Sequence, residues 1–189
     1  MILRDTIKKT EESQAYKEWK KKNPDYYLAH AFTMLDEKEK RYRWELGYYS
    51  PTKDKLTVIE TEPEIRAKAE EDVFKKDGTV QALDMKKVKI SVTRAMEICD
   101  ELLKEKYKNQ MVSKRIILLQ KATAQMYNIT LVTHTFSILN IRIDAGSGEV
   151  ISHNLQSIMN LGSWERGGGG KKEPAGSTPS TPTDERTPD

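Results

Sequence analysis

Three histidines and one cysteine are the side chains of this sequence best suited to binding a metal or acting as nucleophiles. The histidines His30, His134 and His153 are far apart, with no His-x-x-x-His or Cys-x-x-Cys spacing. A zinc site would need ligands from neighbouring strands, such as His134, His153 and Asp144. Outward-facing polar positions on strands explain these histidines more simply. The sequence therefore predicts no metal site and no cofactor.

The single cysteine, Cys99, lies within the apolar stripe of a predicted helix. A cysteine in that position acts as a small buried hydrophobic residue, whereas a nucleophilic thiolate needs exposure and a basic partner. General acid–base pairs occupy clefts, but the carboxylates of the predicted turns should face water: Asp36, Glu37, Glu39 and Asp54. We therefore predict no catalytic residues and a protein that is not an enzyme.

The elements that must position these side chains begin with a predicted helix at residues 6–22, which contains no Gly or Pro. Three strands are predicted after it: 26–35, 42–48 and 56–61. The second strand alternates large apolar with polar residues, which is typical of a half-buried strand. Its predicted core row is Tyr42, Trp44, Leu46 and Tyr48. Arg43 and Tyr49 lie on the opposite face, where they are a possible exposed binding surface.

The second half of the chain repeats this order after a charged connector at residues 63–88, in which a short surface helix could form. Ser91 is a plausible N-cap for a helix that runs to about Tyr107 with one apolar stripe. The predicted strands are 112–119, 127–136 and 139–143, with 150–155 returning from a turn at 144–149.

Composition limits the class of protein. The chain has 189 residues, of which 37% are hydrophobic and 32% charged, with a formal net charge of +3. This near-balance disfavours a nucleic-acid-binding domain, which would carry a larger basic excess. A single cysteine excludes an internal disulfide. The sequence shows neither a signal-peptide core nor an apolar run that would cross a bilayer, so we expect a cytoplasmic protein without a membrane partner.

The order of elements predicts an α+β fold of tandem units, each a helix plus a three-stranded antiparallel sheet. The units are 1–62 and 89–162, and two such small units would share a core. The alternative is one continuous α+β domain without a repeat. Residues 165–189 are rich in Gly, Pro, Thr and Ser and lack large apolar side chains. We predict that this tail is disordered.

Two stretches of the second half resemble a PepSY domain. Residues 91–99 resemble the opening helix of that family, and residues 141–151 resemble its closing hairpin. In such a hairpin Asp144 can bond the turn backbone and Gly148 can take a positive φ. The resemblance covers roughly residues 89–155, and the first half would be a degenerate second copy.

PepSY domains are small non-catalytic modules of peptidase propeptides and of membrane or secreted proteins. The resemblance implies that this chain binds or restrains a peptidase or another extracytoplasmic partner, although no export signal is visible. Our leading hypothesis is a binding or scaffolding module that holds a protein or peptide at an exposed sheet face or edge. The alternatives are a nucleic-acid-associated protein that uses an aromatic and basic sheet face, and a cryptic enzyme with a cleft between the units. The sequence does not set the oligomeric state.

Overall fold

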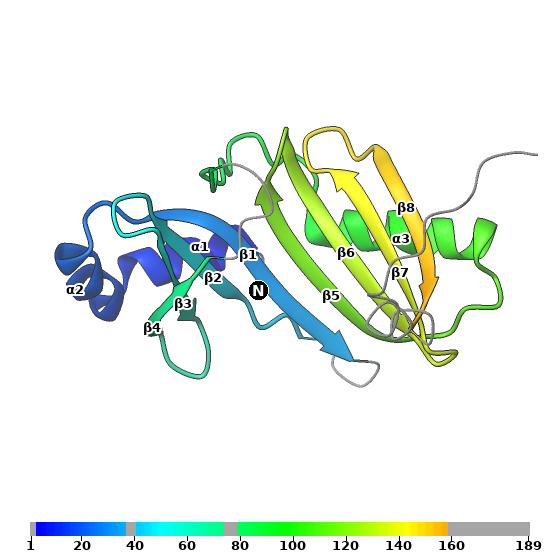
Figure 1. Ribbon diagram of the computed structural model, residues 1–189, viewed down its shortest axis with the longest axis horizontal. Coiled ribbons are helices and arrows are strands. Elements are labelled where there is room, and N and C mark those ends of the chain that lie inside the picture. Colours follow the sequence, from blue (N-terminus) through cyan, green and yellow to red (C-terminus); the bar gives the residue numbers. More distant parts are fainter. Residues whose placement is uncertain (1–2, 37–40, 74–78, 159–189) are drawn as a thin grey trace, which may run out of the picture.

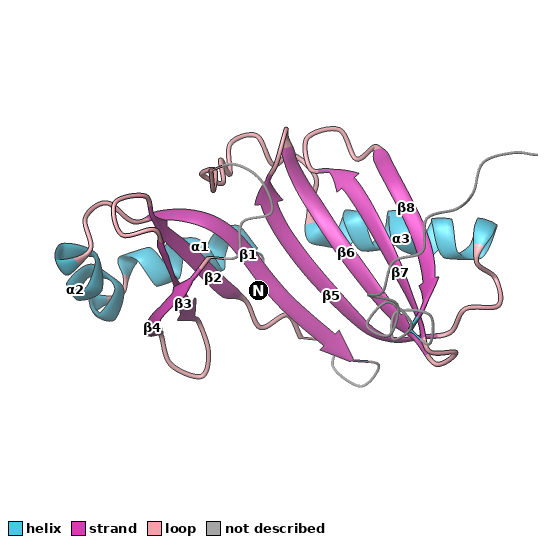
Figure 2. Ribbon diagram, viewed as in Figure 1, coloured by secondary structure: helices cyan, strands magenta, loops and turns pink. Residues whose placement is uncertain are grey.

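The protein has an α+β fold in which helices cover one face of a large antiparallel sheet (Figures 1 and 2). The computed structural model describes residues 3–36, 41–73 and 79–158, so the predicted tail at 165–189 lies outside the described residues. The helices are α1 (Leu3–Glu12), α2 (Gln14–Lys22) and α3 (Val92–Lys106). The strands are β1 (Tyr27–Asp36), β2 (Glu45–Ser50), β3 (Lys55–Glu60), β4 (Arg66–Asp72), β5 (Val112–Lys121), β6 (Gln125–Thr133), β7 (Ser137–Asp144) and β8 (Val150–Ser157).

The described strands form one eight-stranded sheet in the order β4-β3-β2-β1-β5-β6-β7-β8. The sequence predicted three strands for each unit, but the structure shows a single sheet with β4 and β8 at its edges. The central pair is β1 with β5, which are antiparallel and in register from His30↔Gln120 to Asp36↔Lys114. Figure 1 shows α1, α2 and α3 on the same side of the sheet.

The first predicted helix, 6–22, is two helices because Ser13 interrupts it. The Ser13 hydroxyl donates a hydrogen bond to the carbonyl of Thr10 at 2.6 Å. Its oxygen also accepts a hydrogen bond from the backbone N–H of Tyr16 at 3.2 Å, which makes Ser13 the N-cap of α2. A serine hydroxyl competes with the helical backbone for hydrogen bonds, so one residue ends α1 and begins α2.

The expectation of a surface helix within the charged connector is wrong, because Arg66–Asp72 forms the edge strand β4. The charges of this segment are paired across the sheet. Arg66 Nη2 lies 2.8 Å from Glu60 Oε2, and Lys68 Nζ lies 3.1 Å from Glu45 Oε1. These partners lie on β3 and β2, so the pairing depends on sheet contacts that local helix propensity does not report.

The core lies between the helices and one face of the sheet. Ala31, Leu119, Tyr127 and Ile143 occupy neighbouring strands in register and are buried on the helix side. Helix α3 buries its apolar stripe against this face: Ala95, Met96, Cys99 and Leu102. The predicted core row of the second strand is buried at Trp44, Leu46 and Tyr48, and Tyr42 is half-buried.

An aromatic cluster joins α2 to the first strands. The ring of Trp19 lies 5.2 Å from that of Tyr26 and 5.5 Å from that of Tyr48, with both pairs edge to face. Tyr16 packs 5.3 Å from Tyr48. Edge-to-face rings combine a large apolar area with favourable ring electrostatics, so these aromatic side chains stabilise the core and are not available as a stacking platform for bases.

Gly47 on β2 makes room for the half-buried imidazole of His30 on β1. The two residues are paired next to a β-bulge in β1. A Cβ at position 47 would lie 2.1 Å from His30 Cε1, far inside van der Waals contact. Burial of the imidazole also lowers the pKa of His30 below its ordinary value. The sheet therefore requires a residue without a side chain at position 47 as long as His30 faces it.

We predict that Gly47→Ala lowers the free energy of unfolding by about 2 kcal/mol, because overpacking of a close-packed site costs about 1–3 kcal/mol. His30→Ala removes the ring, so the same Gly47→Ala change should cost much less in a His30→Ala background. Urea unfolding of the two single variants and the double variant measures this coupling. Equal costs in both backgrounds would contradict the steric explanation.

Candidate functional site

The sheet face opposite the helices is hollowed over the second half of the chain. The hollow has a volume of about 880 Å³ and lies over β5–β8. Its lining combines amide, hydroxyl and guanidinium groups with apolar side chains. The polar residues include Gln120, Asn128, Thr130, Asn140, Arg142, Ser152 and Asn154, and the apolar residues are Leu118, Ala122, Met126, Ile129, Ile141 and Ile151. Thr130 donates a hydrogen bond to Asn140 Oδ1 at 2.8 Å, so neighbouring strands order part of this surface. Such groups both donate and accept hydrogen bonds, as a peptide backbone or polar side chain requires of a partner.

An apolar strip adjoins the hollow on the same face. Phe32 pairs with Leu118, and Met34 pairs with Ile116, across the β1–β5 junction. Met34 is 42% exposed, and Ile116 and Leu118 are half-buried. The open face therefore offers apolar contact at the centre of the sheet and hydrogen-bonding groups towards β8.

The two edges of the sheet differ in charge. Edge strand β4 has the sequence RAKAEED, in which five of seven residues are charged. Edge strand β8 has the sequence VISHNLQS, without Lys, Arg, Asp, Glu or Pro, and Ile151 within it is 49% exposed. Charged residues and proline are the usual protection of an edge against pairing with another strand. Within the described chain, β8 is the edge that lacks this protection.

The structure does not bring together the predicted alternative metal ligands. His134 is exposed beyond the end of β6, and its backbone N–H donates to the carbonyl of Met111 at 2.9 Å. His153 lies on β8, where its Nδ1 is 2.6 Å from the hydroxyl of Tyr107 at the end of α3. Asp144 lies at the opposite end of β7 from the His134 loop. Within residues 3–36, 41–73 and 79–158 no group of three or more His, Cys, Asp or Glu side chains is placed to hold a metal ion.

The predicted exposed surface at Arg43 and Tyr49 is wrong for Tyr49. Arg43 is exposed, but Tyr49 is 4% exposed. Tyr49 pairs with Tyr27 in the β1–β2 register, and their rings pack edge to face at 5.7 Å. The Tyr49 hydroxyl donates to Asp54 Oδ1 at 2.7 Å. Alternation along one strand assigned Tyr49 to the helix-free face, but the ring of its cross-strand neighbour covers it there.

Cys99 is buried against the sheet, and burial raises the pKa of its thiol to about 12. At neutral pH this thiol is therefore protonated. The thiolate is the reactive form of a cysteine, so the buried, protonated Cys99 fits a packing role in the core.

The turn between β7 and β8 holds the two residues predicted to shape it. Asp144 Oδ1 accepts hydrogen bonds from the backbone N–H groups of Gly146 and Ser147, each at 2.8 Å. These bonds lower the pKa of Asp144 below its ordinary value. Gly148 has a φ of +83°, a conformation that L side chains rarely adopt. The turn sets the register in which β8 joins the sheet.

We predict that Asp144→Ala lowers the free energy of unfolding at neutral pH by about 1–2 kcal/mol. This is below the value of about 1.5–3 kcal/mol for a hydrogen bond to a charged group, because the Asp144 carboxylate is partly exposed to solvent. The exposed neighbour Glu149 provides the control Glu149→Ala, which should change stability little. Since the folded-state pKa of Asp144 is lowered, its contribution is present above the unfolded pKa of about 3.9 and is lost as the pH falls through the folded value. Urea unfolding from pH 7 to pH 2 should show that the free energies of unfolding of the natural chain and of Asp144→Ala converge in acid. A difference that stays constant with pH would contradict this.

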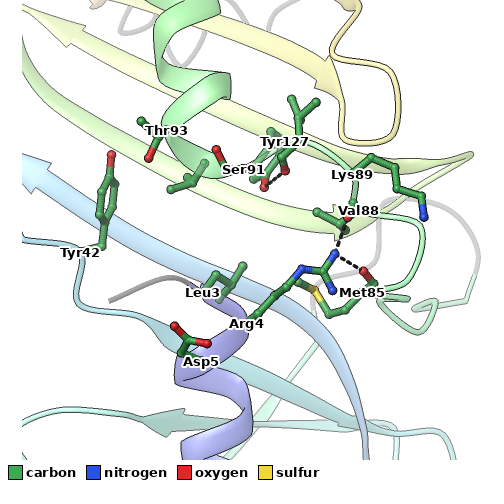
Figure 3. A pocket seen from close by; sticks show the side chains of 12 residues that line it. Leu3, Arg4, Asp5, Tyr42, Met85, Val88, Lys89, Ser91, Thr93 and Tyr127 are labelled. Atoms are coloured by element: carbon green, nitrogen blue, oxygen red, sulfur yellow. Dashed lines mark hydrogen bonds between the residues drawn. The ribbon is translucent and has the colours of Figure 1, made fainter.

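A cleft between the first turn of α1 and the start of α3 is a second candidate site (Figure 3). Its volume is about 530 Å³. The apolar side chains that line it are Leu3, Met85, Val88, Ile90 and Val92, with Tyr42 and Tyr127. The polar lining consists of Arg4, Asp5, Lys89, Ser91 and Thr93. Sequence reasoning missed this cleft because its residues come from four separate parts of the chain.

Hydrogen bonds fix the walls of this cleft. Arg4 Nη2 donates to the carbonyls of Met85 at 2.7 Å and Val88 at 2.5 Å, which ties α1 to the segment before α3. The hydroxyl of Tyr127 donates to the carbonyl of Ile90 at 3.1 Å. Burial raises the pKa of Tyr127 to about 12, so this phenol is neutral at physiological pH. None of the three histidines, nor Cys99, is among the described residues that line the cleft.

Comparisons with known proteins show little. No family model matches the sequence, and no curated protein matches it. A solved structure of a "putative lipoprotein" from Clostridium difficile 630 is similar, with a TM-score of 0.49 and 19% sequence identity. The match covers 75% of this chain and 90% of that chain. In the part of the chain that the structure describes, no helix is long and apolar enough to span a membrane.

Proposed function

We propose that this chain is a non-enzymatic binding module that holds an extended segment of a protein or peptide by strand addition at β8. The observation that carries the proposal is the charge-free edge of β8 beside the open, polar face of the sheet. Main-chain hydrogen bonds to an exposed edge provide affinity, and contacts with alternate side chains provide specificity.

The surroundings of β8 indicate which partner fits. Ser152, Asn154 and Gln156 alternate along β8 with His153 and Leu155, so they lie on opposite faces of the sheet. In the first set, Ser152 and Asn154 pair with Arg142 and Asn140 on β7, and Gln156 pairs with Ile138. An added strand would place polar side chains next to these amides and apolar side chains near Leu155. Specificity is therefore for a peptide with alternating polar and apolar residues.

We further propose that the two halves are tandem units and that the second is PepSY-like. In each half a helical segment precedes four strands. From the central β1–β5 pair the strands of each half follow in chain order to the edge. An approximate two-fold axis between β1 and β5 would relate such halves. A peptidase as the partner and a cytoplasmic location stay predictions from the sequence.

Selection of ten-residue peptides from a displayed library tests the proposed function. We expect the selected peptides to slow amide hydrogen exchange at residues 150–157, because strand addition hydrogen-bonds the edge of β8 that pairs with no other described strand. Mass spectrometry of exchanged fragments, with and without peptide, locates the protection. Protection confined to β4, or to the cleft between α1 and α3, would contradict binding at β8.

Charges placed on the edge test the same proposal by affinity. We predict that Asn154→Lys with Gln156→Lys weakens binding of the selected peptide at least tenfold, because edge lysines oppose strand pairing. The control is Gln81→Lys with Asn109→Lys, which adds the same charge at exposed positions outside the strands and should leave affinity unchanged. Fluorescence anisotropy of labelled peptide measures both. An equal loss in the two double variants would indicate a net-charge effect and count against the edge.

A further inference from the structure

We propose that the cleft between α1 and α3 binds a small amphiphile with an apolar body and one anionic group. This inference rests on the cleft and is independent of strand addition at β8. A volume of about 530 Å³ lies within the usual range for ligand pockets, about 300–1,000 Å³. Pockets of this kind combine a mainly apolar lining with a few polar groups that orient the ligand.

The apolar part of the site is built from three elements of the fold. Leu3 belongs to α1, and Val92 begins α3. Tyr127 belongs to β6 at the base of the cleft, with its hydroxyl held by Ile90. These side chains are partly or fully buried in the core, so their positions do not depend on a ligand. A hydrocarbon or aromatic body would be stabilised there because it removes apolar surface from water.

Positive groups gather at one end of the cleft. In Figure 3 the guanidinium of Arg4 and the ammonium of Lys89 lie on the side of Val88. Arg4 is bonded to backbone carbonyls, and these do not neutralise its charge. An anionic group on a ligand would be stabilised at this end.

The opposite end of the cleft is acidic. Figure 3 shows the carboxylate of Asp5 on the side of Tyr42, away from Lys89. Burial raises the pKa of Tyr42, so its hydroxyl stays neutral at physiological pH. A second anionic group would meet the Asp5 carboxylate there. The two ends therefore specify a ligand with one anionic group, in contrast to an amphiphile that is charged at both ends.

The test compares three ten-carbon probes by isothermal titration calorimetry on the full chain, each below its micelle concentration. We expect decanoate to bind at least tenfold more tightly than decanol, which lacks the charge, and decanedioate, which carries two. Asp5→Asn should strengthen decanedioate binding several-fold and change decanoate binding little. Equal affinities for the three probes, or no binding of decanoate, would overturn the proposal.

Variants at the rim locate the binding. Lys89→Gln should weaken decanoate binding about three- to fivefold, the range for an exposed charge pair, whereas Lys86→Gln, a neighbouring lysine outside the lining, should not. The exposed residue Thr93 allows Thr93→Trp, which should occlude the cleft while circular dichroism shows the native fold. Asn154→Lys with Gln156→Lys should bind decanoate like the natural chain. If only this last variant lost decanoate binding, the ligand would lie on the open sheet face and the proposal would be wrong.

Discussion

The antiparallel pairing of β1 with β5 is the contact on which the rest of the structure depends. It joins residues that are 78 to 90 positions apart in the sequence, from Asp36↔Lys114 to His30↔Gln120, and places Ala31, Thr33, Ile117 and Leu119 in a fully buried centre. Without this pair the sheet would end at two further edges, each with unpaired backbone groups. The pair also makes one continuous sheet, so all three helices pack on the same face of it. The cleft between α1 and α3 results from that arrangement.

The helices lie on one side of the sheet only, and this leaves the other side accessible for binding. The helices cover one face, so the opposite face and both edges meet solvent in the described part of the molecule. On the first half of that face, side chains cover one another: Tyr27 packs on Tyr49, and Lys68 pairs with Glu45 and Glu60. On the second half the face stays open as a hollow of mixed polar and apolar lining. This asymmetry is the reason that the proposed binding is assigned to β5–β8.

The segment that leads into α3 holds the two candidate sites in place. Leu83 N donates to the carbonyl of Leu28 on β1, and Lys89 N and Ile90 N donate to the carbonyl of Ala145 in the β7–β8 turn. Arg4 adds the bond from α1. One stretch of chain thus spans the first half, the cleft wall and the turn that sets β8, so its backbone bonds keep the cleft pre-formed at little conformational cost.

The sequence by itself determined the α+β class, most strands, the cap at Ser91 and the core row that contains Trp44 and Leu46, because alternation, capping and turn chemistry are local. Local chemistry also explains the turn at Asp144 and Gly148. Tertiary structure decided that the charged connector forms β4, that Tyr49 is buried and that β8 is an unprotected edge. It also assembled the cleft. Each of these depends on which distant strand or helix lies alongside, and neither residue periodicity nor propensity records that neighbour.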